Sequence, residues 1–464
     1  MRFSHCVIGA CLMAVGHARP KPCKHVPPVT ATSVAWVDPP NQVPTPGAPG
    51  ASGSSPSGAT TPLPAATSSA ATNNTTVPLP AGSAVVSSAP DGSAPSPVPT
   101  PAASGPSGGS SAPPTTTAAP ATTATPATTA TTQTAPAASP VRAYPADIVD
   151  RLRDSSFPKL ESFSGSNVAG SGCTLQNAAV RYEWSDLSVP QREEYIASVK
   201  CLMTKPSKLS ASEAPGAKTR YDDFLVAHIQ QTPNIHNTAN FLTWHRYFTW
   251  AFEQALRNEC GYKGYQPYWN WDRYAKDPEH SPLFNGNASS LSGNSPRPGA
   301  CVDTGPFADM KVNLGPGNSL RYNPRCLKRS ISRSNAQGTT ADKTYALITR
   351  SNDITSFQNN MQTPAGVHAS GHFTVGGDPG GDLYASPGDI YFYVHHAMID
   401  RVFWLWQLQD LQTRLKSVGG NTGAGRRGTL DDLMNVGVNG GDVKLGSLLN
   451  TLGGNDGKFC YIYM

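Results

Sequence analysis

The side chains best able to do chemistry in this chain are histidines, which gather in two short stretches. No cysteine lies inside either stretch, and neutral imidazoles without thiolates favour a borderline metal such as copper, zinc, iron or nickel. Two groups of three ligands would hold two metal ions in one shared pocket. The first stretch holds His228, His236 and His245, and the second holds His368, His372, His395 and His396.

The spacing of these histidines separates candidate ligands from neighbours. His368 and His372 are four residues apart, so both point from one face of a helix. A lone histidine is usually a core residue, but six clustered among aromatic residues are not explained that way. His280, in the polar run DPEHSP, is expected at the surface.

His395 and His396 are adjacent, so on a helix their side chains diverge by roughly 100°. Only one of them can ligate the metal held by His368 and His372. We favour His396, with His395 as a neighbour, because Asp400 follows His396 by four residues. A carboxylate there could form a hydrogen bond with the ligating ring and fix its orientation.

The elements that must position these histidines are mainly helices. Ser188 can cap a helix with Pro190 in its first turn. Long Pro-, Gly- and Asn-rich loops are expected over 277–344, with a sequon at Asn287. The predicted fold class is mainly α: a four-helix bundle around the metal centre, with long loops and little sheet. Its histidine-bearing helices are predicted at 221–230, 241–257, 357–372 and 389–411.

Composition divides the chain into three parts. Residues 1–18 resemble a secretory signal peptide. Residues 19–141 are rich in Pro, Ser, Thr and Ala and carry almost no charge, which predicts a disordered, mucin-like stalk with sequons at Asn73 and Asn74. An unmodified flexible tail is the alternative. Residues 142–464 form the predicted catalytic domain.

Charge and cysteine content limit the partners. A formal net charge of +5 without a dense basic run gives no reason to expect nucleic-acid binding, and no long apolar stretch predicts a membrane span. Six cysteines in the domain favour disulfides in a secreted protein, with Cys301–Cys326 as the pair expected. A protein that is free in the medium and one that is associated with the cell wall are both consistent with this expectation. Free buried thiols are the alternative.

Two motifs carry a resemblance to a known family. The pattern His236-x4-Phe-x2-Trp-His245-Arg, followed by PYWNWD, resembles the CuA signature of tyrosinases and catechol oxidases. The pattern Asp389-x2-Phe-x3-His396-x3-Asp-Arg resembles their CuB signature, and the ending CYIYM is similar to that of short secreted fungal members. The resemblance covers residues 180–464. It implies a type 3 centre of two copper ions, one held by His228, His236 and His245, and the other by His368, His372 and His396.

Departures from the family pattern bear on the reaction. Asn234 stands where many fungal tyrosinases carry a thioether-forming cysteine, so no thioether is expected, and Ile390 replaces a proline. Ala369 follows the first CuB histidine, where efficient monophenol hydroxylases often carry Asn or Asp. The window 354–367 lacks the water-holding glutamate of such enzymes. The chain ends at the Tyr461-x-Tyr463 motif, so the C-terminal shield of latent members is expected to be absent.

The resemblance therefore implies a copper enzyme that oxidises o-diphenols, or o-aminophenols, to quinones with O2 and hydroxylates monophenols weakly. A true tyrosinase, a reversible O2-binding protein and a cell-wall protein with a vestigial copper site are the alternatives. Small phenols and O2 are the expected partners. Phe248, Phe373 and Phe392 are candidate aromatic walls, and Glu253 or Glu279 could supply a distant base.

Overall fold

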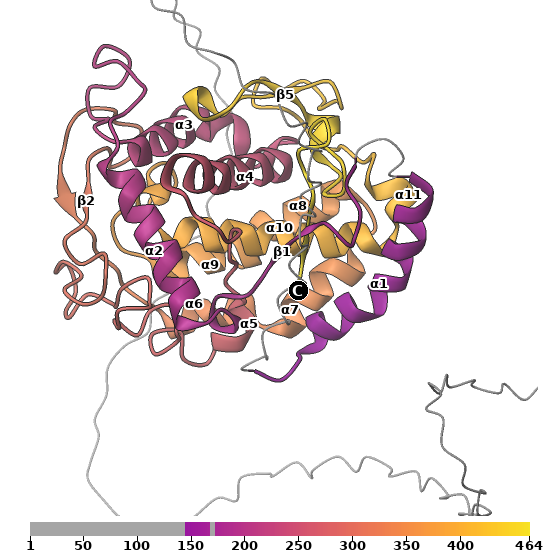
Figure 1. Cartoon of the computed structure of the whole chain (residues 1–464), viewed down its shortest axis with the longest axis horizontal. Coiled ribbons are helices and arrows are strands. Elements are labelled where there is room, and N and C mark those ends of the chain that lie inside the picture. Colours follow the sequence, from indigo (N-terminus) through magenta and orange to yellow (C-terminus); the bar gives the residue numbers. More distant parts are fainter. Residues whose placement is uncertain (1–143, 168–171) are drawn as a thin grey trace, which may run out of the picture. The chain divides into compact units, whose positions relative to one another are not determined.

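The computed structural model describes residues 144–167 and 172–464. Four helices form the centre of the domain, and each carries candidate metal ligands or ends beside one (Figure 1). Helices α4 and α10 pack against each other, with α3 beside α4 and α9 beside α10. These helices are α3 (Arg220–Ile235), α4 (Phe241–Cys260), α9 (Val367–Val375) and α10 (Tyr391–Gln409).

Local sequence signals explain where the central helices begin and end. Thr219 and Asp222 form a capping box at the start of α3. Helix α4 stops at Gly261, which adopts the left-handed conformation (φ 71°) that ends many helices. Every residue of α10 except Gln409 is buried, so α10 is the axis around which the other helices pack.

The helix predicted over 357–372 is wrong as a single element. The structure contains two helices, α8 (Ile354–Gln362) and α9, separated by the turn at Thr363–Gly366. Thr363 is extended (ψ 158°), as expected for a residue that precedes proline. A Cβ on Gly366 would lie 2.3 Å from the carbonyl oxygen of Met361, so only glycine fits this turn.

Two long helices lie outside the predicted set. Helix α1 (Ile148–Asn167) docks on α10 through the buried ion pair between Arg401 and Asp150 (2.7 Å). Helix α7 (Ala341–Arg350) lies at the end of the predicted loop region. Helix α2 (Val189–Thr204) begins as predicted, with Ser188 accepting a hydrogen bond from the backbone of Gln191.

Sheet is confined to three two-stranded pairs in the described residues, which confirms the mainly helical fold class. Strand β1 (Ala179–Arg181) pairs in parallel with β6 (Tyr461–Tyr463) and joins the two ends of the domain. The remaining short elements are α5 (Trp271–Tyr274), α6 (Arg333–Ala336), α11 (Leu411–Arg414), β2 (Lys311–Val312), β3 (Arg325–Cys326), β4 (Leu433–Met434), β5 (Val443–Lys444) and the 3-10 turns η1 (Trp184–Asp186), η2 (Gln337–Thr339), η3 (Ser386–Gly388), η4 (Gly437–Asn439) and η5 (Leu445–Leu448).

Three disulfides connect the loops to this core. The predicted Cys301–Cys326 bond is confirmed, and it closes the loop that contains β2. Cys201–Cys260 joins α2 to the end of α4, and Cys173–Cys460 fastens the segments that precede β1 and β6. All six domain cysteines are therefore paired.

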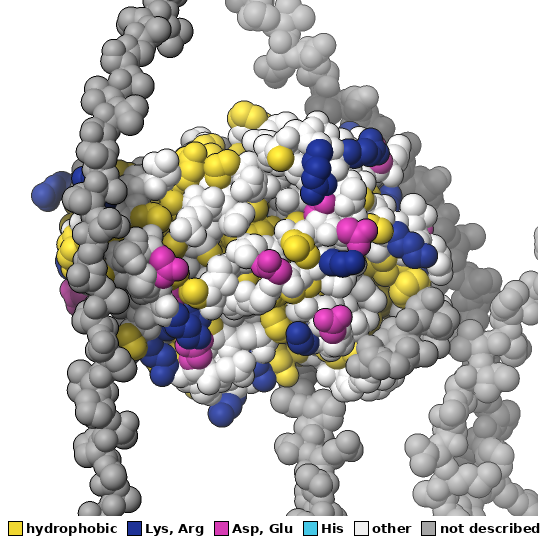
Figure 2. Space-filling view, turned by 90° about the horizontal axis from the view of Figure 1, so that it is seen from above, with side chains coloured by type: hydrophobic (Ala, Val, Ile, Leu, Met, Phe, Trp, Pro, Cys, Tyr) yellow, Lys and Arg dark blue, Asp and Glu magenta, His cyan; other side chains and the backbone are white. Residues whose placement is uncertain are grey.

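The surface is mixed in charge. Lys and Arg side chains are interspersed with Asp and Glu on the uncovered part of the face in Figure 2. His280 is exposed, as predicted, and lies 3.0 Å from Asp277, and the Asn287 side chain is also exposed. Within the described ranges, every helix is too short or too polar to cross a bilayer. The predicted signal peptide, the stalk, Asn73 and Asn74 lie outside those ranges.

Candidate metal centre

The first histidine group is assembled by α3 and α4. His228 lies in the middle of α3, His236 directly follows its last residue, and His245 lies one turn into α4. Each ring has its Nδ1 beside a backbone carbonyl: Tyr384 for His228 (2.8 Å), Thr232 for His236 (3.0 Å) and Phe241 for His245 (2.8 Å).

These contacts decide which ring nitrogen can bind a metal. A carbonyl only accepts, so each Nδ1 must carry the proton and each Nε2 keeps its lone pair. The Nε2 atoms of His228 and His245 are buried and have no hydrogen-bond partner among the described residues. Ligand atoms of all three rings lie within 4.8 Å of one another.

The second group is assembled by α9 and α10. His368 and His372 share one face of α9, as their spacing predicts, and their Nε2 atoms are 3.2 Å apart. The Nε2 atom of His396 on α10 is also 3.2 Å from that of His372. The Tyr391 hydroxyl donates to the carbonyl of Gly380 (2.7 Å) and therefore accepts from Nδ1 of His372 (2.8 Å).

The nitrogens that converge here are electron-rich. Because Nδ1 of His372 holds the proton, its Nε2 presents a lone pair to two other imidazole nitrogens. Without a metal, a proton on Nε2 of His368 or His396 can bond to this lone pair, and a bound metal cation would take the place of that proton. The donor set thus fits a metal that accepts neutral imidazole.

His395 differs from its neighbour in its hydrogen bonding. The indole N–H of Trp271 donates to Nδ1 of His395 at 3.0 Å. Indole is only a donor, so Nδ1 of His395 holds no proton, and in the neutral ring Nε2 must hold it. His395 consequently has no free lone pair for a metal, although its ring lies within the same group as His368, His372 and His396.

Burial keeps all of these rings neutral. Desolvation lowers the pKa of His236 to about 4 and that of His372 to about 3. The pKa values of His228, His245, His368 and His396 are also lowered, first by burial and then by neighbouring histidines. Neutral imidazole is the form that binds a metal, so the pocket is prepared for one at ordinary pH.

The two histidine groups pack against each other. The rings of His245 and His396 stack across the groups, with centroids 4.3 Å apart. Phe392 lies against His396 (4.1 Å) and His228 (5.2 Å), and it is buried like Phe248. Of the three predicted aromatic walls, only Phe373 lines the open pocket, while the other two support the histidines from within the core.

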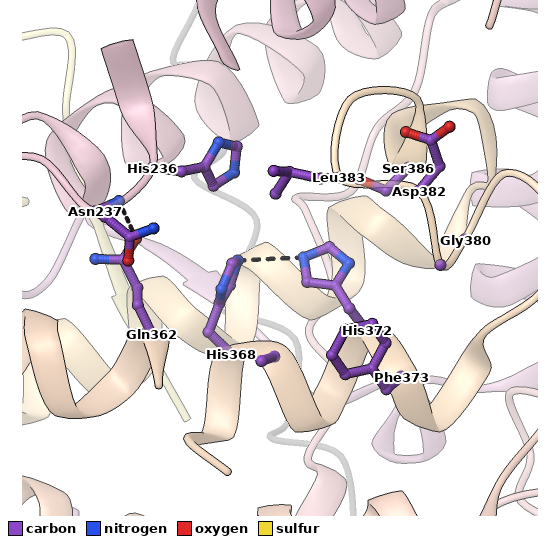
Figure 3. A pocket seen from close by; sticks show the side chains of 12 residues that line it. His236, Asn237, Gln362, His368, His372, Phe373, Gly380, Asp382, Leu383 and Ser386 are labelled. Atoms are coloured by element: carbon purple, nitrogen blue, oxygen red, sulfur yellow. Dashed lines mark hydrogen bonds between the residues drawn. The ribbon is translucent and has the colours of Figure 1, made fainter. Parts of the chain in front are cut away.

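The pocket opens directly on both groups (Figure 3). His236 from the first group and His368 and His372 from the second line it. Its cavity volume is about 130 Å³ and its mouth is open to solvent, so a small aromatic ring can enter it. The other lining residues are Asn237, Gln362, Ala369, Phe373, Gly380, Gly381, Asp382, Leu383 and Ser386.

Two predictions about carboxylates are wrong. Asp400 does not support His396, because its oxygens bind Arg246, Tyr461 and Tyr463 instead. The Nδ1 atom of His396 is buried without a partner in the described residues. Two arginines and two hydroxyls surround Asp400, so it connects α10 to α4 and β6 rather than to the metal centre.

The proposed distant bases are also elsewhere. Glu253 is buried and bound to Arg181 (3.0 Å) and to the backbone of Gln266 (2.8 Å), and Glu279 is bound to Asn294 (3.0 Å). Neither glutamate lines the pocket. The carboxylate that does line the pocket is Asp382, which sequence reasoning missed.

Asp382 belongs to a segment that touches both histidine groups. We call residues 380–386 the bridging segment. The carbonyl of Tyr384 accepts from His228, and the carbonyl of Gly380 accepts from Tyr391, which in turn holds His372. No periodic pattern marks this segment in the sequence, so only the Gly-Gly-Asp turn at its start could have drawn notice.

Comparison with known proteins agrees with this geometry. Residues 218–409 match the model of the common central domain of tyrosinase. Tyrosinase P of Aspergillus terreus is 38% identical over 284 residues, which cover 52% of this chain and 79% of that protein. The chain belongs to the tyrosinase family.

Other family members extend the comparison. N-acetyl-6-hydroxytryptophan oxidase of Emericella nidulans is 33% identical over 350 residues, covering 63% of this chain and 93% of that protein. A solved variant of polyphenol oxidase from Thermothelomyces thermophila shares 36% identity and a TM-score of 0.63, covering 68% of this chain and 96% of that one. Together with the two histidine groups, the tyrosinase family identifies the centre as a type 3 dicopper site and the protein as a copper oxidoreductase.

Proposed function

We propose that this tyrosinase-family protein oxidises o-diphenols to o-quinones, and related o-aminophenols to o-quinone imines, with O2, and that it hydroxylates monophenols poorly. Two o-diphenols and one O2 give two o-quinones and two waters, so electrons and protons balance. The observation that supports this best is the pocket, which reaches histidines of both groups and lacks a free carboxylate.

We propose His228, His236 and His245 as ligands of one copper, and His368, His372 and His396 as ligands of the other. Bound copper and O2 would supply the two-electron oxidation. The chain's contribution is to orient the rings: four of the six Nδ1 atoms lie beside oxygen acceptors, which directs the Nε2 lone pairs into the centre.

The lack of a proton acceptor supports the preference for diphenols. A monophenol with a pKa of about 10 must lose its proton to bind copper as phenolate. Ala369 lines the pocket and offers no polar group. Asp382 accepts N–H groups of Gly317 (2.6 Å), Tyr384 (2.8 Å) and Ala385 (3.1 Å), which occupy most of its lone pairs.

The side-chain amide of Gln362, which also lines the pocket, already has hydrogen-bond partners. Gln362 accepts the backbone N–H of Asn237 (2.7 Å) and donates to the carbonyl of Gln358 (3.2 Å). An amide can hold a water but is a poor proton acceptor. A catechol needs less help, because it is more acidic than a phenol and presents two oxygens to the metals.

The deciding experiment is O2 uptake by the copper-loaded protein on catechol, o-aminophenol, tyrosine, a simple monophenol and a hydroxyindole, the last because of the E. nidulans relative. Rapid uptake with catechol and slow uptake with tyrosine are expected. Two bound coppers without catechol-dependent uptake would favour an O2-binding protein, and less than one copper would favour a vestigial site.

We also propose that the protein is exported. Three disulfides connect distant parts of the domain, and such bonds persist in oxidising compartments. The described residues contain no helix able to span a bilayer. Detection of the protein in culture medium, with the residues before 19 removed, would test this proposal.

A further inference from the structure

The pocket mouth carries an apolar side chain that the described residues leave largely uncovered. Leu383, in the bridging segment, is 55% exposed and lines the pocket beside His236 and His372 (Figure 3). Phe373, which follows His372 on α9, is 47% exposed and lines the same pocket. Large apolar side chains gathered at the opening of a pocket are typical of a binding surface.

The position of Leu383 is determined by its neighbours. Asp382 accepts three backbone N–H groups, two of them from the residues just beyond Leu383. The carbonyls of Gly380 and Tyr384 are held by Tyr391 and His228. The bridging segment is thus anchored at both ends, and the exposure of Leu383 is built into the fold. Preorganised apolar surface of this kind is favourable to cover with a ligand.

The lining of the same pocket has few charged groups that could bind a charged substituent. Apart from the histidines, Asp382 is the single ionisable residue among those that line it, and its carboxylate faces backbone N–H groups. The other polar lining groups, such as Asn237, Gln362 and Ser386, are neutral. A carboxylate brought to this surface would lose water without gaining a counter-charge, and an ammonium would meet only Asp382, whose oxygens already accept three N–H groups.

We propose that Leu383, assisted by Phe373, makes the enzyme selective for o-diphenols whose ring substituent is uncharged and apolar, over those that carry an ammonium or a carboxylate. This inference rests on the proposed diphenol oxidation. Leu383 acts here as a specificity-determining residue that covers the substituent, while the histidine centre acts on the two hydroxyls.

The test compares kcat/KM for catechol, 4-tert-butylcatechol, dopamine and 3,4-dihydroxyphenylacetate. The copper-loaded protein is expected to favour 4-tert-butylcatechol over both charged substrates by roughly tenfold or more. Leu383→Ser should lower kcat/KM for 4-tert-butylcatechol by about fivefold, the factor expected if the substrate covers half of a leucine side chain. Catechol itself, which has no substituent, should change less than about twofold.

Leu433→Ser is the matched control, because Leu433 is 59% exposed and does not line this pocket. It should leave all four values unchanged. Equal losses for catechol and 4-tert-butylcatechol in Leu383→Ser, or a preference for dopamine in the unaltered protein, would overturn the inference while leaving diphenol oxidation intact.

Saturation-transfer NMR on the copper-free protein separates the two proposals. The tert-butyl protons of 4-tert-butylphenol should receive saturation that Leu383→Ser removes and Leu433→Ser retains. No oxidation of any catechol, together with this NMR result, would overturn the proposed function and not the apolar contact. Absence of the NMR effect in a protein that oxidises catechol would count against Leu383.

Discussion

The indole N–H of Trp271 donates to Nδ1 of His395 across 3.0 Å, and this bond distinguishes two adjacent histidines. A Cβ on Gly371 would lie 2.2 Å from Cε1 of His395, so glycine at that position leaves room for the ring. His395 is therefore a spacer between α5, α9 and α10, whereas Nε2 of His396 faces His372.

Copper content should follow this distinction. Replacing His396 with Ala is expected to remove one of two coppers, because the second group then has two ligands. His395→Gln should keep both coppers, since the glutamine oxygen can accept the N–H of Trp271. Metal analysis of the purified variants checks this. Full occupancy in His396→Ala with loss in His395→Gln would reverse the assignment.

Tyr391 is expected to matter for copper retention through its hydroxyl. Tyr391→Phe removes the acceptor for Nδ1 of His372, and loss of such a partner typically weakens metal binding about 10- to 100-fold. Competition with a copper chelator measures the change. Tyr393→Phe is the control, because the Tyr393 hydroxyl is buried on the same helix and has no hydrogen-bond partner in the part of the chain that the structure describes. Equal weakening in both variants would refute the role of the hydroxyl.

Ala369 should limit monophenol hydroxylation. Ala369→Asn places a polar group in the pocket that can hold a water near a phenol hydroxyl. We expect the ratio of monophenol to catechol activity to rise roughly tenfold, less than the hundredfold or more that a positioned base contributes. Ala369→Val is a control for size. Rapid tyrosine hydroxylation by the unaltered protein, without a lag that catechol shortens, would contradict the idea.

The copper-free protein should lose stability in mild acid. The pKa of His236 is about 4 in the folded protein and about 6.5 when unfolded, so the unfolded chain binds more protons between these values. The contribution of the His236 imidazole to the free energy of unfolding is fully present above pH 6.5, and it falls as the pH drops toward 4. The free energy of unfolding is expected to fall by about 3 kcal/mol, because the pKa of His236 differs by roughly 2.5 between the folded and unfolded states.

Denaturant unfolding of the copper-free protein at pH 7 and at pH 4 measures this loss. His236→Gln removes the titrating group and keeps a polar side chain, so the variant should lose less stability than the unaltered protein over the same interval. Identical losses in the two proteins would show that His236 does not titrate as its burial indicates.

Removal of residues 19–141 should leave the domain unchanged. Their composition is dominated by Pro, Ser, Thr, Ala and Gly and supplies few large apolar side chains to a core. The melting temperature is expected to stay within about 2 °C, and copper content should remain two per chain. A large drop in melting temperature, seen by calorimetry, would mean that this segment packs on the domain.

The sequence alone determined three of the four histidine-bearing helices, α3, α4 and α10, because the information is local. Apolar and aromatic residues recur at helical spacing around His228, His245 and His396, and the capping signals at Ser188, Thr219 and Gly261 lie within a few residues of the ends they define. The four-residue spacing of the two histidines on α9 is likewise a property of one helix.

The tertiary structure decided the features that depend on distant residues. The partner of Asp400 could not be read from a spacing of four, since Arg246 and Tyr463 approach it from α4 and β6. Helix α1 was not predicted because its amphipathic pattern is weak. Its position depends on the Arg401–Asp150 ion pair, which forms only in the folded domain. The roles of the ring nitrogens of His372 and His395, and the exposure of Leu383, depend on contacts between segments that are distant in the sequence. Only folding brings those segments together.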